Sequence, residues 1–289
     1  MVRATFRSAS GARFSEVLAL PLVLSLLVAV VLTPMLRARL TEAGFLGENY
    51  RGLRLPVPLG VVIVPAALIA LIPIALLARL TSADVFPTDL SLVIAFIPGV
   101  ALLGLIDDIF SGESRGWRGH AKAAMSGRFS SGVLKAAGTL GLALLVASSL
   151  PGSDKEFLLA TAVLVLATNA FNLLDLRPGR SLKALVVLGA ALTIATQLTE
   201  PLWALGIFLG PALVAGFYDL REKAMLGDSG SNVIGALAGV WLVLTLDTSE
   251  QVIALIVLVL VNLYGEFKSI STVIEKVPGL RHLDSLGRT

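Results

Sequence analysis

The sequence predicts an all-α membrane protein, a polytopic bundle of transmembrane helices. Apolar residues make up 56% of the 289 residues and charged residues only 15%, and the mean hydropathy is +0.87. Charged residues are about 25% of an ordinary soluble protein. A helix needs about 20 mostly apolar residues to cross a bilayer. Nine runs of suitable length are present, at residues 16–36, 57–79, 86–106, 132–150, 156–174, 182–198, 201–217, 230–246 and 251–267.

These runs occupy nearly the whole sequence, so we expect one membrane domain over residues 1–289. It divides into an N-terminal extension (1–15), the bundle (16–267) and a C-terminal tail (268–289). We expect no secretory signal peptide, because the first run is long and no small-residue cleavage site follows it. The sequence has no cysteine, which excludes disulfides, thiolate metal sites and cysteine nucleophiles.

The charges between the runs predict the orientation of the bundle. Seventeen lysines and arginines lie in the loops after the odd-numbered runs and in the tail, whereas the opposite loops carry Arg79 and Lys155 and seven acids. The positive-inside rule places the first set in the cytoplasm, although Arg3, Arg7 and Arg13 would then lie outside. We therefore expect a multi-pass protein of the inner (plasma) membrane, with its net charge of +3 in a cytoplasmic basic rim and no nucleic-acid surface.

The tail has an apolar periodicity of its own. Its apolar residues recur at helical spacing on both sides of Pro278, which predicts an amphipathic segment on the cytoplasmic interface. His282 in this segment is interpreted as an interface residue and not as a ligand. The apolar residues are Ile270, Val273, Ile274, Val277, Leu280, Leu283 and Leu286.

Three acidic motifs lie at the cytoplasmic ends of the runs. Carboxylates are costly at the edge of the hydrocarbon region and are usually functional there. Four of them at one membrane face predict a metal ion and a phosphorylated substrate. The motifs are Asp107 and Asp108 after the third run, Asn169, Asn172 and Asp175 at the end of the fifth, and Gly227, Asp228, Ser229 and Gly230 before the eighth.

The first two motifs each allow two interpretations. Adjacent residues of a helix point about 100° apart, so one of Asp107 and Asp108 can bind a metal while the other handles a proton or a second metal contact. Alternatively the pair marks a helix end, although a C-terminal end disfavours negative charge. The spacing of three places Asn169, Asn172 and Asp175 on one strip of a helix. This strip forms either part of a site or hydrogen bonds between helices.

The third motif predicts a tight loop that enters a helix N-terminus. Backbone N–H groups at such an end suit phosphate oxygens, and Asp228 could hold a cation that bridges them. The alternative is an N-cap, since Asp and Ser are favoured capping residues.

The order of the three motifs resembles the polyprenyl-phosphate N-acetylhexosamine-1-phosphate transferase family. The first cytoplasmic loop, from Asn49 to Gly60, is also similar to a basic loop of that family, and Lys135 is similar to a lysine in its active site. The likeness extends from about Tyr50 to Gly235. It implies that a UDP-N-acetylhexosamine donates its sugar phosphate to a polyprenyl phosphate and releases UMP, for cell-envelope glycan synthesis. A homodimer would also agree with the family.

The resemblance implies roles for the motif residues. Such a transfer needs a divalent cation with oxygen ligands, Mg²⁺ or Mn²⁺, across the diphosphate, and positive charge at the second phosphate. Asp228 and Asp108 would bind the metal, and Asp107 would orient or deprotonate the lipid phosphate, with the roles of Asp107 and Asp108 exchangeable. Asn172 and Asp175 would complete the cluster. Further substrate contacts are expected from Asn169, Lys135, Arg51, Arg54, Gly227 and Ser229.

The sequence also departs from the family pattern. Pro178 replaces a second acid, and Arg177 and Arg180 beside it would bind the donor's phosphates or a different head group. Met225 stands where an aromatic residue stacks on uracil, and the late histidine-rich loop and a tenth span have no counterpart. The sugar therefore stays undetermined.

Other classes of function remain open. One alternative is an altered or inactive homologue that binds polyprenyl phosphate or a nucleotide sugar. A transporter is a further alternative, but its acids should lie near the membrane midplane. For any one of Lys135, Arg51 and Arg54, the positive-inside rule alone also explains the presence of a cation at that position.

Overall fold

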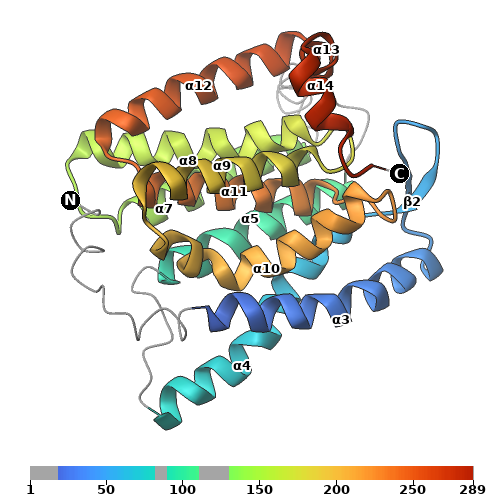
Figure 1. Cartoon of the computed structure of the whole chain (residues 1–289). Coiled ribbons are helices and arrows are strands. Elements are labelled where there is room, and N and C mark those ends of the chain that lie inside the picture. Colours follow the sequence, from blue (N-terminus) through green and yellow to red (C-terminus); the bar gives the residue numbers. More distant parts are fainter. Residues whose placement is uncertain (1–18, 82–89, 111–129, 289) are drawn as a thin grey trace.

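The computed structural model describes residues 19–81, 90–110 and 130–288, and this part of the chain folds into a helical bundle (Figure 1). A long helix is present at each of the nine predicted runs, which confirms the all-α polytopic membrane fold. The long helices are α3 (Leu20–Glu42), α4 (Ile63–Thr81), α5 (Leu90–Phe110), α7 (Ser131–Ala147), α8 (Asp154–Leu174), α9 (Arg180–Thr196), α10 (Glu200–Leu220), α11 (Asp228–Thr245) and α12 (Thr248–Phe267).

The described helices differ in how well they suit a bilayer. Six are long and apolar enough to cross one, namely those that include α3, α4, α5, α8, α10 and α12, while α7 is apolar but shorter. Helices α9 and α11 are not in this group. Helix α11 packs against α5, α8, α9 and α10, and residues 229–245 are all buried. A helix enclosed by other helices needs no lipid-facing apolar surface.

Small residues allow α11 to lie close to its neighbours. A Cβ atom at Gly235 would come within 2.7 Å of the Thr168 backbone in α8, and one at Gly239 within 3.2 Å of Leu164. Close backbone approach of this kind is typical of helix packing in membranes. The middle of α11 therefore lies close against α8.

Helix α3 extends beyond its apolar run, which ends at residue 36. The helix continues to Glu42 because arginine and glutamate are good helix formers, and Arg39 pairs with Glu42 at 2.8 Å. The chain then leaves the helix at Gly44, which has a φ of 78°.

A small antiparallel hairpin follows α3 and was not expected from the sequence. Strands β1 (Leu46–Glu48) and β2 (Arg54–Pro56) pair with Gly47 opposite Leu55. Asn49 closes the turn, because its Oδ1 accepts hydrogen bonds from the N–H groups of Arg51 and Leu53, both at 2.9 Å. A 3₁₀ turn, η2 (Leu59–Val62), then leads into α4.

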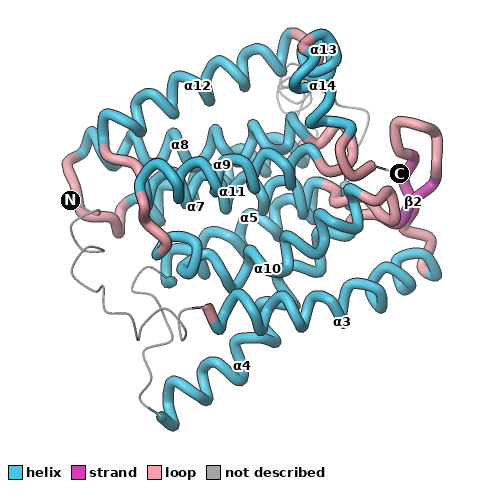
Figure 2. The backbone as a smooth tube through the Cα atoms, viewed as in Figure 1, coloured by secondary structure: helices cyan, strands magenta, loops and turns pink. Residues whose placement is uncertain are grey.

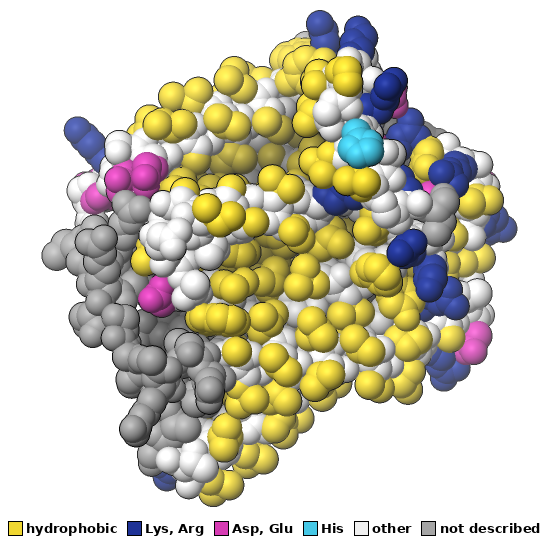
Figure 3. Space-filling view, viewed as in Figure 1, with side chains coloured by type: hydrophobic (Ala, Val, Ile, Leu, Met, Phe, Trp, Pro, Cys, Tyr) yellow, Lys and Arg dark blue, Asp and Glu magenta, His cyan; other side chains and the backbone are white. Residues whose placement is uncertain are grey.

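The hairpin and the C-terminal helices α13 (Ile270–Lys276) and α14 (Pro278–Ser285) lie at the same end of the bundle (Figure 1). Figure 2 shows the loops gathered at the two ends of the helices. In Figure 3 apolar side chains cover the middle, Lys and Arg gather toward the end with α14 and the hairpin, where some acids also lie, and a group of acids lies toward the other end. We call the first of these the basic end, formed by residues 43–58, 175–179, 221–227 and 268–288.

The separation of charge agrees with the predicted basic rim, while its cytoplasmic location stays a prediction. Some of the cations counted for it lie outside the described residues, as does the extension at residues 1–15. These cations are Arg115, Arg118, Lys122 and Arg128. The tail is helical as expected, and its exposed apolar side chains are Val273, Val277, Leu280, Leu283 and Leu286.

Candidate functional site

The acidic motifs meet around the N-terminus of α11, at the basic end of the bundle. A lysine joins two of them. The ammonium group of Lys135 in α7 contacts a carboxylate oxygen of Asp107 in α5 at 2.5 Å and also contacts the carboxylate of Asp228 at the start of α11. The Lys135 side chain is 17% exposed and that of Asp107 is 10% exposed. Because the two carboxylates would repel each other in this half-buried place, the lysine stabilises their approach. The arrangement is a cationic centre between two carboxylates.

Asp108 has a different role from its neighbour, because it caps α11 from another helix. Its two carboxylate oxygens accept hydrogen bonds from the backbone N–H groups of Asp228 at 2.7 Å and Ser229 at 2.8 Å. A negative charge at a helix N-terminus is favourable because it opposes the positive end of the helix dipole. Asp108 thereby fixes where Asp228 begins the helix.

Two glycines make this cap possible. Gly227 has a φ of 70°, and a Cβ atom there would lie 2.8 Å from a carboxylate oxygen of Asp108. A Cβ atom at Gly104 would lie 2.5 Å from the backbone oxygen of Asp228. No side chain fits at either contact, so glycine is required for α5 to reach the end of α11.

The cap occupies N–H groups that were expected to bind phosphate at the N-terminus of α11, and phosphate binding there stays a prediction. The first two of these groups bond to Asp108, and the next two, of Gly230 and Ser231, donate to the backbone oxygen of Gly227 at 3.1 and 3.0 Å. A helix start has four N–H groups without an ordinary partner inside the helix, and three of them, those of Asp228, Ser229 and Gly230, are occupied. The N–H of Ser229 is therefore held by Asp108 and is not a free donor in this structure. Asp228 and Ser229, the residues expected as caps, do not cap α11 with their own side chains, and Asp108 of α5 does so instead.

The two asparagines of the second motif both lie in α8 but contact two different helices. Asn172 accepts a hydrogen bond at 2.8 Å from the hydroxyl of Ser231 in α11, which places it beside the third motif. Asn169, in contrast, donates to the side-chain oxygen of Asn262 in α12 at 2.6 Å. This is the hydrogen bond between helices that the sequence left as the alternative. Of the two asparagines, only Asn172 points toward α11.

Asp175 ends α8 and lies in the same acidic region. The hydroxyl of Ser181 donates to its carboxylate at 3.2 Å. Burial raises the pKa of Asp175 well above its ordinary value, and the nearby carboxylates of Asp219, Asp228 and Asp108 raise the pKa further. A carboxyl group with a raised pKa near other carboxylates is typical of a functional site.

Asp219 was missed in the sequence and connects two loops of the site. Its side chain is in α10 and is 4% exposed. One carboxylate oxygen accepts from the N–H of Gly179 at 2.7 Å and the other from the N–H of Leu226 at 3.3 Å. Asp219 therefore joins the loop after Asp175 to the loop before Asp228. The signal was an acid directly after an apolar run at the basic end, two residues beyond the expected end of the run at 217.

The hairpin residues expected to bind substrate lie beside these loops. Arg51 pairs with Glu222 at 3.4 Å, and the amide of Asn49 donates to the same carboxylate at 3.0 Å. Arg54 is exposed at the start of β2. Met225 binds the hairpin through its backbone, donating to Pro56 and accepting from Leu59, both at 2.9 Å.

The two arginines beside Pro178 have partners within the protein. Arg177 lies over the ring of Tyr50, 4.2 Å from its centre, and pairs with Glu275 at 3.4 Å. Arg180 is 4% exposed and pairs with Asp284 at 2.7 Å. Arg180 in particular is directed at the C-terminal tail and not at the acidic motifs.

The residues present fit a divalent cation that arrives with a substrate. Among the described residues, no three acidic or histidine side chains form a ready metal cage. Mg²⁺ commonly binds one or two carboxylates together with substrate phosphates and water. Asp228 and Asp107 already converge on one positive group, so their oxygens suit a hard cation in the presence of a diphosphate.

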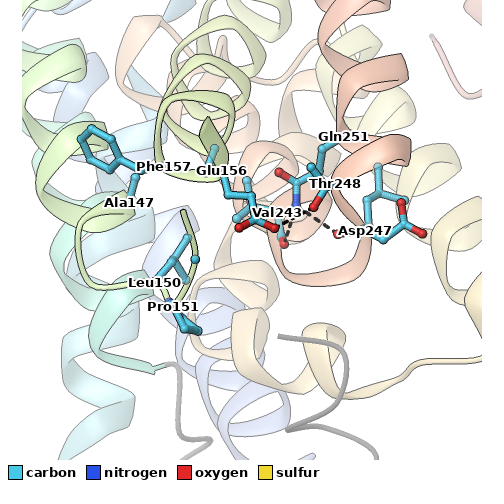
Figure 4. Close-up of a pocket in the computed structure, with 12 residues that line it drawn as sticks. Ala147, Leu150, Pro151, Glu156, Phe157, Val243, Asp247, Thr248 and Gln251 are labelled. Atoms are coloured by element: carbon cyan, nitrogen blue, oxygen red, sulfur yellow. Dashed lines mark hydrogen bonds between the residues drawn. The ribbon is translucent and has the colours of Figure 1, made fainter. Parts of the chain in front are cut away.

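A pocket at the opposite end of the bundle lies away from the motifs (Figure 4). There Glu156 accepts a hydrogen bond from the hydroxyl of Thr248 at 2.8 Å. The amide of Gln251 donates to the backbone oxygens of Val243 and Leu246 at 3.3 and 3.0 Å. These contacts join the ends of α8, α11 and α12. None of the acidic-motif residues lines this pocket.

Comparison with known proteins agrees with the geometry. The family model described as glycosyl transferase family 4 matches residues 90–246, which is more than half of the chain. A search among curated proteins found no match. The matched range runs from α5 through α11 and contains all three acidic motifs, whereas the hairpin and the C-terminal tail lie outside it.

Proposed function

The chain belongs to glycosyl transferase family 4, the family of polyprenyl-phosphate hexosamine-1-phosphate transferases, and from this we propose its reaction. At the family level it is a phospho-sugar transferase that acts on a polyprenyl phosphate. We propose that the donor is a UDP-N-acetylhexosamine and that UMP is released. The observation that carries the proposal is the convergence of Asp107, Lys135 and Asp228 at one end of α11.

The proposed reaction is a displacement at phosphorus. An oxygen of the lipid phosphate attacks the β-phosphorus of the donor, and the bond from that phosphorus to the bridging oxygen breaks. The bridging oxygen leaves with UMP, and the product is a polyprenyl-diphosphate-sugar. Such transfers depend on positioning and on stabilisation of charge more than on covalent participation by the protein.

The central residues have separate tasks in this proposal. Asp107, held by Lys135, orients the lipid phosphate and accepts its proton when the phosphate arrives protonated. Lys135 exchanges one of its carboxylate partners for a phosphate oxygen and stabilises the charge that develops there. Bound Mg²⁺, or Mn²⁺, supplies positive charge at the diphosphate. Asp228 would hold that cation, and Asp108 sets the position of Asp228 through the helix cap.

This assignment modifies the expectation for Asp108. Both of its oxygens already accept backbone N–H groups, so we propose Asp108 as the residue that orients Asp228, and Asp107 as the second carboxylate near the cation. Arg54 and Arg51 of the hairpin remain candidates for the donor's phosphates. Asn172 and Asp175 border the same region.

The location is proposed from the charges. Lys and Arg gather at the end of the bundle that carries the motifs (Figure 3), and the positive-inside rule places such an end in the cytoplasm. Nucleotide sugars are made there. We propose a multi-pass protein of the inner (plasma) membrane with its site facing the cytoplasm, serving cell-envelope glycan synthesis.

A second candidate function follows from the departures at residues 177–180. Pro178 stands where an acid was expected, and Arg180 is taken up by Asp284. A chain with this loop could bind polyprenyl phosphate or a nucleotide sugar without transferring it. The experiment must distinguish such a binding protein from a transferase.

The test is a donor panel. Purified full-length protein is given polyprenyl phosphate, Mg²⁺ and a series of UDP-sugars and other nucleotide sugars, and release of nucleoside monophosphate is measured. We expect release from at least one UDP-amino sugar, its loss in Asp228→Asn, and its retention in Asp154→Asn, an exposed acid at the other end of the bundle. Binding of a donor without release across the whole panel would establish the binder instead.

A further inference from the structure

The C-terminal helices are attached to the start of α9 by an ion pair. Two guanidinium nitrogens of Arg180 donate to the two carboxylate oxygens of Asp284 in α14, at 2.7 and 2.9 Å. The third nitrogen donates to the hydroxyl of Ser271 in α13 at 2.6 Å. Paired N–H groups that match both oxygens of a carboxylate form one of the strongest side-chain contacts in proteins. Arg180 thus binds both C-terminal helices.

The same carboxylate collects further positive charge. Arg288 donates to both oxygens of Asp284, at 2.5 and 3.1 Å, and also to the backbone oxygen of Pro178 at 3.0 Å. The ammonium group of Lys183 donates to the backbone oxygens of Leu283 at 3.0 Å and Asp284 at 2.6 Å. Burial acts to raise the pKa of Asp284, but the hydrogen bonds from Arg180 and Arg288 outweigh it and lower the pKa.

The Asp284 carboxylate therefore pairs with two guanidinium groups and lies beside the ammonium group of Lys183. Without the Asp284 carboxylate, Arg180, Arg288 and Lys183 would repel one another at short range. The Asp284 side chain is therefore the centre of the attachment, beside a second ion pair between Arg177 and Glu275.

Hydrophobic packing contributes little to the attachment. No residue of α13 or α14 is buried. Between the tail and α9 there is an apolar hollow, and the side chains that border it do not fill it. The apolar residues that line it are Leu174, Ala184, Val187, Ile274, Leu280 and Leu283. Polar contacts through Asp284 are thus the main connection.

The tail and the candidate site hold the same loop. Alternate residues of this loop contact the tail on one side and the site on the other. Pro178 and Arg180 contact the tail. Gly179, between them, donates to Asp219, which also holds the loop before Asp228. Ser181 donates to Asp175 at 3.2 Å. The segment from 178 to 181 is therefore held by the tail on one side and by the site on the other.

From these contacts we propose that Asp284 is a positioning residue for donor binding, which holds the loop 175–181 in place through Arg180 and Arg288. The proposal rests on the proposed transferase function. Asp284 touches no reacting group, and the tail lies outside the residues that match the family. Loss of Asp284 should weaken donor binding, with a KM about 10- to 100-fold higher for a displaced binding loop. The kcat should change much less.

The first test measures the loop without any substrate. Hydrogen exchange of the amides in residues 175–183 is followed by mass spectrometry in full-length wild type, Asp284→Ala, Asp284→Glu and the control Arg281→Ala. Arg281 is an exposed cation of the same helix α14. We expect exchange about tenfold or more faster in Asp284→Ala, a smaller rise in Asp284→Glu, and no change in Arg281→Ala. Unchanged exchange in Asp284→Ala overturns the proposal.

The second test separates positioning from stability. KM for the nucleotide sugar and kcat are measured for the same variants with the donor that the panel identifies. A raised KM that Asp284→Glu partly restores supports positioning, whereas faster exchange with an unaltered KM overturns it. If wild type releases nucleotide from no donor, the transferase proposal fails by itself. The inference is then decided by exchange together with the Kd of nucleotide sugar, and an unaltered Kd in Asp284→Ala overturns it.

Discussion

The cap made by Asp108 leads to a prediction that distinguishes a structural carboxylate from a metal ligand. Asp108→Asn keeps the size of the side chain and one acceptor oxygen, but it removes the negative charge and one of the two backbone hydrogen bonds. If Asp108 is a cap, the main effect of this change falls on stability and on the position of Asp228. If Asp108 binds the metal, the effect falls on Mg²⁺ affinity.

The size of the effect follows from the two contacts. A hydrogen bond to a charged group contributes about 1.5–3 kcal/mol, and the charge itself about 0.3–1 kcal/mol at a helix N-terminus. Losing one such bond and the charge should therefore lower the free energy of unfolding by about 2–4 kcal/mol. Asp228→Asn leaves both bonds to Asp108 in place, because its backbone N–H is unchanged. That variant should lose turnover with a much smaller effect on the fold.

Two measurements carry the comparison. Thermal unfolding of the purified full-length variants gives the loss of stability, and a Mg²⁺ titration of nucleotide release gives the half-saturating concentration. We expect Asp108→Asn to unfold at a clearly lower temperature and to keep a half-saturating Mg²⁺ concentration close to that of wild type. Unchanged stability with a tenfold higher Mg²⁺ requirement would refute the cap as the role of Asp108.

The same structure makes two further predictions. Gly227→Ala should lower the free energy of unfolding by about 3 kcal/mol or more, because φ is 70° and the new Cβ would meet Pro58 at 2.6 Å and Asp108 at 2.8 Å. Gly44→Ala is its control, because Gly44 has a φ of 78° but nothing lies within 4 Å of the new Cβ. Thermal unfolding should show a loss of only about 1–2 kcal/mol for this control. Equal losses in the two variants would contradict a steric clash at Gly227. For pH, the pKa of Asp284 is lowered in the folded chain, so its contribution is full above the unfolded pKa of about 3.9 and is lost as pH falls through the folded value. The stability difference between wild type and Asp284→Asn should therefore be constant near neutral pH and shrink below about pH 4, and a difference that is undiminished at about pH 3 would count against the ion pair.

The helices could be located from the sequence because a bilayer imposes a minimum length on each apolar run. The ends were less accurate, since α3 continues through charged residues that a hydropathy window excludes. The hairpin was not found at all. Its strands are three residues long, and their stability depends on the Asn49 turn and on contact with Glu222, far away in the sequence.

The candidate site was found as a set of residues but not as a set of contacts. A spacing of three turns a helix by about 300°, so each step of the second motif shifts the side chain by about 60°. This one step of about 60° is enough for Asn169 to face α12 while Asn172 faces α11. The cap at Asp108 was hidden for another reason. It requires Gly104 and Gly227 to bring two backbones together across 120 positions of the sequence.

The loop 175–180 and the tail are best understood as one electrostatic unit. The loop has lost an expected acid at Pro178 and carries Arg177 and Arg180, and the tail supplies an acid to each of them, Glu275 and Asp284. Because a buried guanidinium without a partner is strongly destabilising, the arginine at 180 requires the carboxylate at 284. Arg180 is 4% exposed and bound to the tail, so its guanidinium group is directed away from a substrate in the site.

The cations for the donor's phosphates should therefore come from elsewhere at the basic end. Lys135 already lies between the carboxylates of the site, and Arg54 is exposed on the neighbouring hairpin. The arginines that replaced the acid would then act on the donor indirectly, by fixing the loop in which they lie. This is why a variant at Asp284 should change the affinity for the donor although its side chain never meets it.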